Sequence, residues 1–206
     1  MKWQSPGENV SKGGNFLTRL IGRLVFWMMG WRIFGEFPDR SKIIVALVPH
    51  SSNLDFLLTI AVLWGMGLKS SFLIKHTVFW FPLGHILKAL GGIPVDRRSE
   101  NGLISQVTEE FQRRSKFILG ITPSGTRKKG TQLKKGFAIL AVSAQIPVLP
   151  AILNYETRTV RFAPLIEDVF DVEKILMLVR QSMDYYSNRS CTKREHQSRR
   201  PRKWHD

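Results

Sequence analysis

The sequence has little cysteine and no apolar leader. Cys191 is the only cysteine in 206 residues and lies in a polar stretch, so a disulfide framework is excluded and no neighbouring thiol indicates a metal site. The first residues lack the charged start, apolar stretch and cleavage site of a secretory signal. We therefore expect a reducing, cytosol-facing compartment and no bound metal.

Acidic residues are also scarce. The chain has 16 Asp and Glu against 31 Lys and Arg, which gives a formal net charge of +15 and a pI near 10.5. Such a surplus requires an acidic partner, namely nucleic acid, anionic lipid, or a phosphorylated substrate or acyl carrier. Helix-turn-helix, zinc-finger and RNA-recognition signatures are absent, and tryptophans and aliphatic residues lie beside the basic residues near the N-terminus. An anionic membrane surface is therefore favoured as a partner, and nucleic acid is disfavoured.

A long uncharged hydrophobic run is absent as well. Residues 16–34 are strongly apolar, but three arginines interrupt them and leave Leu24 to Trp31 as the longest uncharged stretch. Spanning a bilayer takes roughly 20 apolar residues. We interpret residues 15–35 as an amphipathic helix that lies in the membrane plane, with an ordinary core helix as the alternative. The expected location is the periphery of a membrane, on its cytoplasmic face.

Both ends of the chain are polar. Residues 1–14 are rich in glycine and are predicted to form a flexible arm. Residues 189–206 are basic and polar, which predicts a disordered tail.

The chain between these ends alternates between two kinds of apolar pattern. Strands are expected at 43–48, 69–74, 93–95, 116–121 and 148–153, with an edge strand at 160–164, and helices at 56–66, 85–90, 101–114, 137–145 and 172–186. Strands alternating with helices indicate an α/β fold, and the length suits one domain, at residues 36–188. The predicted architecture is a single domain with a mixed, largely parallel sheet flanked by helices and preceded by the amphipathic helix.

A histidine and an aspartate follow the first strand of this domain. Pro49 ends the apolar run 43–48, so His50 falls at a strand-to-loop junction, and Asp55 falls at the start of the next helix. A spacing of five is poor for two side chains on one helix face, so the pair requires His50 to be in the loop. A neutral imidazole oriented by a carboxylate is suited to general base catalysis.

Three further blocks follow this pair, at 91–98, 122–127 and 146–150. In order and spacing, the four blocks resemble those of the glycerolipid acyltransferase family, which includes the lysophosphatidic acid acyltransferases. The resemblance covers roughly residues 35 to 155, and four ordered blocks are far more specific than any one of them. It implies that His50 is the general base, that Asp55 is its partner, and that the acceptor attacks directly without an acyl-enzyme.

Two arginines end the second and third blocks. The turn Ser124-Gly125-Thr126 exposes backbone N–H groups beside Arg127, which suits a phosphate dianion. By resemblance, this turn, Arg127 and Arg97 bind the anionic head of the acceptor, with Lys75 as a further candidate. The family usually has Glu where this chain has Ser124, so the motif does not by itself specify a glycerol phosphate acceptor.

The resemblance implies an O-acyltransferase of phospholipid biosynthesis. It would transfer a fatty acyl group from acyl-CoA or acyl-carrier protein to a hydroxyl of a lysophosphatidic acid-like lysophospholipid, without a cofactor. Ser124 leaves open another single-chain acceptor such as an aminolipid. The charge leaves open a non-catalytic basic protein that binds membranes or nucleic acid, although a binding module has no need of the His50 and Asp55 pair.

Overall fold

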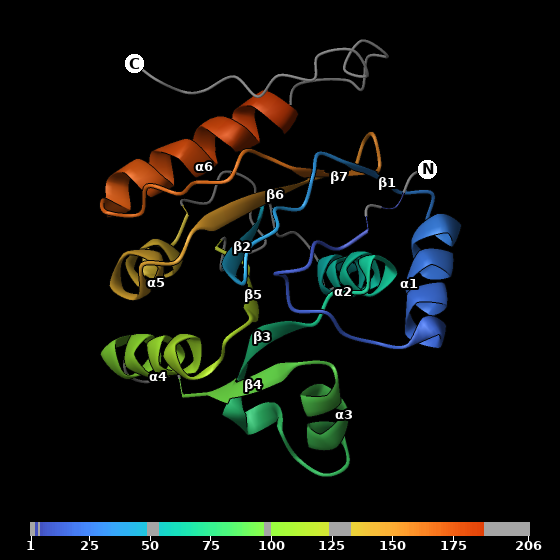
Figure 1. The fold of residues 1–206 in the computed structure, drawn as a ribbon, viewed down its shortest axis with the longest axis horizontal. Helices are drawn as coiled ribbons and strands as arrows, with labels where there is room; N and C mark the ends of the chain where they lie inside the picture. Colours follow the sequence, from blue (N-terminus) through green and yellow to red (C-terminus); the bar gives the residue numbers. More distant parts are fainter. Residues whose placement is uncertain (1–2, 4, 49–53, 97–99, 124–132, 188–206) are drawn as a thin grey trace.

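The protein folds around one seven-stranded sheet. The computed structural model describes residues 3, 5–48, 54–96, 100–123 and 133–187, and Figure 1 shows the sheet between two layers of helices. The strands are β1 (Arg32–Phe34), β2 (Lys42–Val48), β3 (Ser70–Lys75), β4 (Gly92–Val95), β5 (Phe117–Ile121), β6 (Val148–Asn154) and β7 (Thr159–Phe162). The helices are α1 (Phe16–Met28), α2 (Leu54–Met66), the short 3-10 helix η1 (His76–Val78), α3 (Leu83–Ala89), α4 (Glu100–Arg113), α5 (Gly136–Ala144) and α6 (Val172–Ser187).

The sheet is mixed and mostly parallel, as predicted. Its strand order is β1-β7-β6-β2-β5-β3-β4. The strands from β6 to β4 all run parallel to their neighbours, β7 runs antiparallel to β6, and β1 runs parallel to β7. Outside the N-terminal segment, the described strands and α-helices match the predicted ones within two residues at each end, and the short helix η1 has no predicted counterpart. The single α/β domain is therefore confirmed.

The handedness of the connections decides which helices share a face of the sheet. The crossovers through α2 and α3 step across the sheet in one direction, and those through α4 and α5 step back in the other. Because parallel crossovers are right-handed, α2 and α3 lie on one face, and α4 and α5 lie on the opposite face. Figure 1 shows this division, with α1 beside α2 and α6 beside α5.

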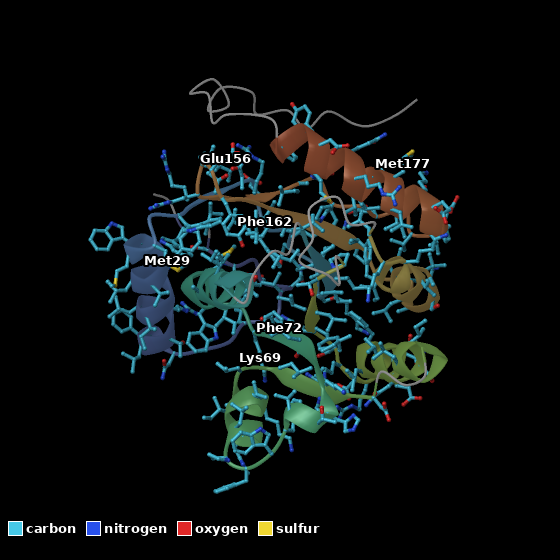
Figure 2. All side chains as sticks on the ribbon, turned by 180° about the vertical axis from the view of Figure 1, so that it is seen from behind. Met29, Lys69, Phe72, Glu156, Phe162 and Met177 are labelled. Atoms are coloured by element: carbon cyan, nitrogen blue, oxygen red, sulfur yellow. The ribbon has the colours of Figure 1, made fainter. Side chains whose placement is uncertain are left out.

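The central strand β2 is buried from both sides. Its residues alternate between two cores, one beneath α1 and α2 and the other beneath α4, α5 and α6. This continuous apolar run is typical of a parallel strand covered by helices on both faces. Figure 2 shows the side chains that fill the space between sheet and helices, with Phe72 and Phe162 among those labelled.

The N-terminal segment corrects one prediction. The predicted helix 15–35 ends at Met28, and residues Arg32–Phe34 form β1, which pairs with β7. Trp31, which lies within the predicted amphipathic helix, is buried against Tyr155, with ring centroids 5.3 Å apart. Strand β7, predicted at the edge of the sheet, has β1 on its outer side.

The predicted flexible arm is also wrong for the residues that the structure describes. Trp3 packs edge-on against Phe26 of α1 at 5.6 Å, and Val10 is fully buried. The backbone N–H of Lys69 donates to the carbonyl of Ser11 at 2.8 Å. A few apolar residues thus hold this N-terminal stretch against the domain, although most of its residues are polar. The predicted tail, residues 189–206, lies outside the described residues.

Helix α1 packs closely on α2 through Gly22. A Cβ at this position would lie 2.7 Å from the carbonyl oxygen of Ala61 and 2.6 Å from the backbone nitrogen of Gly65. The guanidinium Nε of Arg23 donates to the carbonyl of Gly65 at 2.9 Å. The two backbones can approach to this extent only because Gly22 has no side chain.

We predict that Gly22→Ala destabilises the fold by about 1–3 kcal/mol, because overpacking against a backbone outweighs the better helix propensity of alanine. For a chain of this size that loss lowers Tm by roughly 2–4 °C per kcal/mol. Thermal unfolding followed by circular dichroism measures it. The matched control is Gly136→Ala at the start of α5, where a Cβ meets nothing within 4 Å. Equal Tm values for the two variants would contradict the close approach.

Candidate active site

The strands that lead to the candidate residues of the first three motif blocks end at one edge of the sheet. Strand β2 ends at Val48, before His50, β4 ends at Val95, before Arg97, and β5 ends at Ile121, before Ser124. Their registers place Ala46 beside Ile121 on neighbouring strands, so β2 extends two residues beyond β5. The carboxyl ends of parallel strands are where ligands bind in open α/β sheets. The described backbone therefore directs all three blocks to one place.

Most of the predicted site residues themselves lie outside the described residues. This holds for His50, Arg97 and the stretch from Ser124 to Arg127. Helix α2 begins at Leu54, so Asp55 is in its first turn, as predicted. The structure thus places the strand before His50 and the helix after it, and the roles of these residues remain predictions.

Lys75 is the predicted site residue whose side chain the structure describes. It is the last residue of β3, is exposed, and pairs in register with Val95, the last residue of β4. It therefore stands at the same sheet edge, next to the strand that leads to Arg97. His76, which belongs to no motif, has its ring Nδ1 3.4 Å from the carbonyl oxygen of Val95.

The glycine pair of the second block has a structural role. Gly91 has a φ of +91°, and a Cβ there would lie 2.1 Å from the carbonyl oxygen of Ser70. Its own carbonyl accepts a hydrogen bond from the N–H of Phe72 at 3.0 Å. The pair therefore ends α3, as predicted, and brings the start of β4 directly against β3. That contact sets how far β4 extends toward the edge where Arg97 follows.

The fourth block supports the site from within the sheet. Residues 146–150 lead into β6, whose Leu149 is in register with Val45 of β2. The N–H of Ile44 donates to the carbonyl of Pro147 at 3.0 Å. Strand β2 is thus held between β5 and β6. The fourth block therefore helps to position and bury the strand that leads to the first block, and we assign no chemical role to it.

Two lysines follow the third block. The backbone N–H of Lys134 donates to the carbonyl of Pro123 at 3.0 Å, which closes the loop between β5 and α5. The Nζ of Lys135 lies 2.5 Å from a carboxylate oxygen of Glu173 on α6, and both side chains are exposed. Lys135 therefore has an acidic partner within the protein. This pairing leaves Lys135 less suited to bind an acidic acyl carrier.

The structure describes one pair of groups with a clear pKa shift. The hydrogen bond from Lys174 lowers the pKa of the Asp168 carboxyl, and the same bond raises the pKa of the Lys174 ammonium. Both groups are exposed and lie beside the start of α6. They belong to none of the motif blocks. Among the described residues, no three His, Cys, Asp or Glu side chains gather as metal ligands.

The motif-bearing part of the chain matches a known family. The model of the Acyltransferase family matches residues 35–154, which is more than half of the chain and includes β2 to β6 with all four blocks. The chain belongs to the acyltransferase family. It is accordingly an enzyme of the O-acyltransferase kind, as the motif resemblance implied.

Individual relatives agree with this assignment. A 1-acyl-sn-glycerol-3-phosphate acyltransferase from Limnanthes douglasii is 28% identical over 195 residues, covering 84% of this chain and 68% of that protein. One of the same name from Cocos nucifera is 26% identical over 148 residues, covering 68% of this chain and 47% of that protein. The crystal structure of the 1-acyl-sn-glycerophosphate (LPA) acyltransferase PlsC from Thermotoga maritima superposes with a TM-score of 0.60 at 18% identity, over 85% of this chain and 80% of that one. That likeness shows the shared fold.

We predict that Gly91→Ala lowers acyltransferase activity by more than its loss of folded protein accounts for. A left-handed residue with a Cβ costs roughly 1–2 kcal/mol, and the contact with the carbonyl of Ser70 must also open. Strand β4 then shifts relative to β3 at the catalytic edge. Specific activity per folded molecule, with the fraction folded measured by circular dichroism, tests this. Gly136→Ala again serves as the control, and activity that falls only with the folded fraction would contradict the prediction.

Proposed function

We propose that this acyltransferase transfers a fatty acyl group from an acyl thioester to a hydroxyl of a lysophosphatidic acid-like lysophospholipid. The observation that carries the proposal is that β2, β4 and β5, which lead to the candidate residues of the first three motif blocks, end at one sheet edge in a chain of the acyltransferase family. The similarity to the 1-acyl-sn-glycerol-3-phosphate acyltransferases from Limnanthes douglasii and Cocos nucifera supports this type of acceptor. Acyl-CoA and acyl-carrier protein are both suitable donors.

The reaction needs one general base and no cofactor. The neutral imidazole of His50 takes the proton from the acceptor hydroxyl as its oxygen attacks the thioester carbonyl. The tetrahedral intermediate collapses, the C–S bond breaks, and the leaving thiolate takes the proton from the imidazolium. Asp55 accepts a hydrogen bond from the other ring nitrogen, which fixes the tautomer and stabilises the charged ring. Breaking the thioester supplies the driving force.

The acceptor is held by its anionic head. Arg127 and Arg97 bind the phosphate through bidentate hydrogen bonds, with the backbone N–H groups of the Ser124-Gly125-Thr126 turn beside them. Lys75 supports this role by its position, since it is exposed at the end of β3 and in register with the last residue of β4.

One residue, Ser124, favours a second class of acceptor. Ser124 replaces the Glu that is usual in this family, so Arg127 lacks the carboxylate that its neighbour would normally supply. An acceptor with a different head, such as a single-chain aminolipid, becomes a competitor of lysophosphatidic acid. Membership of an enzyme family speaks against the purely binding alternative.

We also propose that α1 attaches the enzyme peripherally to the cytoplasmic face of a membrane. The apolar side chains of one face of α1 are exposed, namely Phe16, Leu17, Leu20, Ile21, Leu24, Trp27 and Met28. The two arginines of α1, Arg19 and Arg23, lie toward the end of α2, at Gly67 and Gly65, beside the exposed apolar face. Positive charge next to exposed apolar side chains suits an interfacial helix on anionic lipid. Within the part of the chain that the structure describes, the helices are too short or too polar to cross a bilayer.

His50→Ala is expected to reduce acyl transfer by roughly 10²- to 10⁴-fold, because the general base is lost. Turnover is measured with saturating thioester and lysophosphatidic acid, and thermal unfolding confirms that the variant folds. Asp55→Asn should also be severe, through loss of the charge that stabilises the imidazolium. Near-normal turnover of His50→Ala would disprove the mechanism.

Ser124→Glu is expected to change which acceptor is used more than how fast the enzyme turns over. A carboxylate beside Arg127 competes with the anionic substrate for the guanidinium, which a hydroxyl does not do. The assay offers lysophosphatidic acid and other single-chain lipids together to wild type and variant, and compares the product ratios. Ser124→Ala is the control, since it removes the hydroxyl without adding charge. An unchanged ratio would show that residue 124 does not select the acceptor.

A further inference from the structure

A second group of apolar side chains is exposed after β3, apart from the face of α1. Trp80 is 61% exposed, Phe81 is 81% exposed, and Val78 and Ile86 stand beside them in sequence at 37% and 54%. The N–H of Gly84 donates to the carbonyl of Trp80 at 2.7 Å, and the ring of Phe81 packs edge-on against His85 at 5.9 Å. These contacts hold the aromatic side chains on a defined turn. We call Val78, Trp80, Phe81 and Ile86 the α3 patch.

The α3 patch lies on the same side of the sheet as α1. Helices α2 and α3 share one face, because their crossovers run in the same direction, and α1 packs on α2. Figure 1 shows α1, α2 and α3 together on that side, with α4, α5 and α6 opposite. The two apolar regions therefore share one side of the sheet, and α4, α5 and α6 cover the other.

Both regions also reach the edge of the sheet where the motif blocks emerge. Trp80 and Phe81 follow the carboxyl end of β3 by a few residues. Helix α1 ends at Met28, and β1 begins shortly after it at Arg32. Arg32 is in register with Thr159 of β7, and Thr159 pairs with Asn154 at the carboxyl end of β6. The C-terminal end of α1, with Trp27 and Met28, therefore leads to the carboxyl edge. The α3 patch and the end of α1 are thus both close to the candidate active site.

The charge of this side of the molecule selects the partner. Residues 9–35 and 56–95, which include α1, most of α2, β3, α3 and β4, contain no Asp or Glu. Their basic residues are Lys12, Arg19, Arg23, Arg32, Lys69, Lys75 and Lys88. Tryptophan with lysine and arginine, free of acids, is typical of a surface that meets anionic lipid headgroups. Lysine is depleted from the cores of protein–protein interfaces, which disfavours a protein partner.

We propose that the α3 patch is a second membrane contact, which inserts into the headgroup region of an anionic bilayer alongside α1. Two separated contacts fix the rotation of the protein on the surface, which one helix lying in the plane cannot do alone. The carboxyl edge of the sheet then faces the lipid. The proposal rests on the proposed function only in treating that edge as the active site; lipid binding itself requires no catalysis.

Vesicle binding without substrate tests the patch. The purified chain is mixed with vesicles of equal parts phosphatidylcholine and phosphatidylglycerol, and bound protein is separated by flotation. The double variant Trp80→Ser with Phe81→Ser should bind about tenfold more weakly than wild type, because two exposed aromatic rings lose their burial. Binding equal to wild type would overturn the proposal and leave α1 as the sole contact.

Phe170 provides a matched control. It is 77% exposed, close to the exposure of Phe81, but precedes α6 and lies between Asp168 and Asp171. Phe170→Ser should leave vesicle binding unchanged. An equal loss for Phe170→Ser and the double variant would show a general effect of surface hydrophobicity and would overturn the proposal.

Two further measurements separate lipid from other partners of the patch. Vesicles with brominated acyl chains should quench the fluorescence of wild type more than that of Trp80→Phe, which keeps the apolar surface but removes one indole.

If gel filtration without lipid gives a dimer that the double variant converts to a monomer, a second copy covers the patch and the proposal is wrong. If vesicle binding holds while acyl transfer to detergent-dispersed acceptor falls, the residues belong to the substrate site and the proposal is equally wrong. Absence of acyl transfer in wild type would refute the proposed function and leave the vesicle result standing.

Discussion

The rest of the structure depends on the pairing of β2 with β5 on one side and β6 on the other. The registers of these pairs fix where β2 ends relative to its neighbours, two residues before His50 in the sequence. Residues of β2 alternate between the two cores, so a shift by one residue would turn each set to the wrong side. Truncating one fully buried isoleucine of this strand, such as Ile44, should cost about 2–5 kcal/mol. The position of the candidate site is thus set by the most buried part of the molecule.

The central elements were predictable because their sequence patterns are local and strong. The run 42–48 is apolar throughout and ends at a proline, and α3 ends at the glycine pair that begins with Gly91. Strand β1 was missed for the opposite reason. It has three residues, continues an apolar segment without a break other than Gly30, and exists only because β7 lies beside it. The N-terminal stretch was misjudged in the same way, since Val10 is one buried residue in a polar sequence.

In the candidate site, too, the features that depend on neighbouring residues in the sequence could be predicted, and those that depend on distant residues could not. The sequence predicts the chemistry of His50 and Asp55 through residue type and spacing, and the structure adds that β2, β4 and β5 end at a common edge. No single sequence segment predicts this edge, because β2 and β5 are separated by α2, β3, η1, α3, β4 and α4 in the chain and are adjacent only through the sheet. The structural role of Gly91 is likewise non-local, since its constraint comes from Ser70 on another strand.

The distribution of charge links this architecture to a lipid substrate. The positive side of the molecule holds α1, α2 and α3, whereas acidic residues such as Glu110, Glu167 and Glu173 belong to the side of α4 and α6, where several form ion pairs with arginine or lysine. Self-neutralised charges attract a membrane weakly, and unpaired basic ones attract it strongly within about 10 Å. In the membrane attachment that we propose, the net attraction therefore turns the α1–α3 side toward anionic lipid before any apolar contact forms. Because the carboxyl edge of the sheet borders that side, the same orientation brings the motif blocks toward the layer in which a single-chain phospholipid resides.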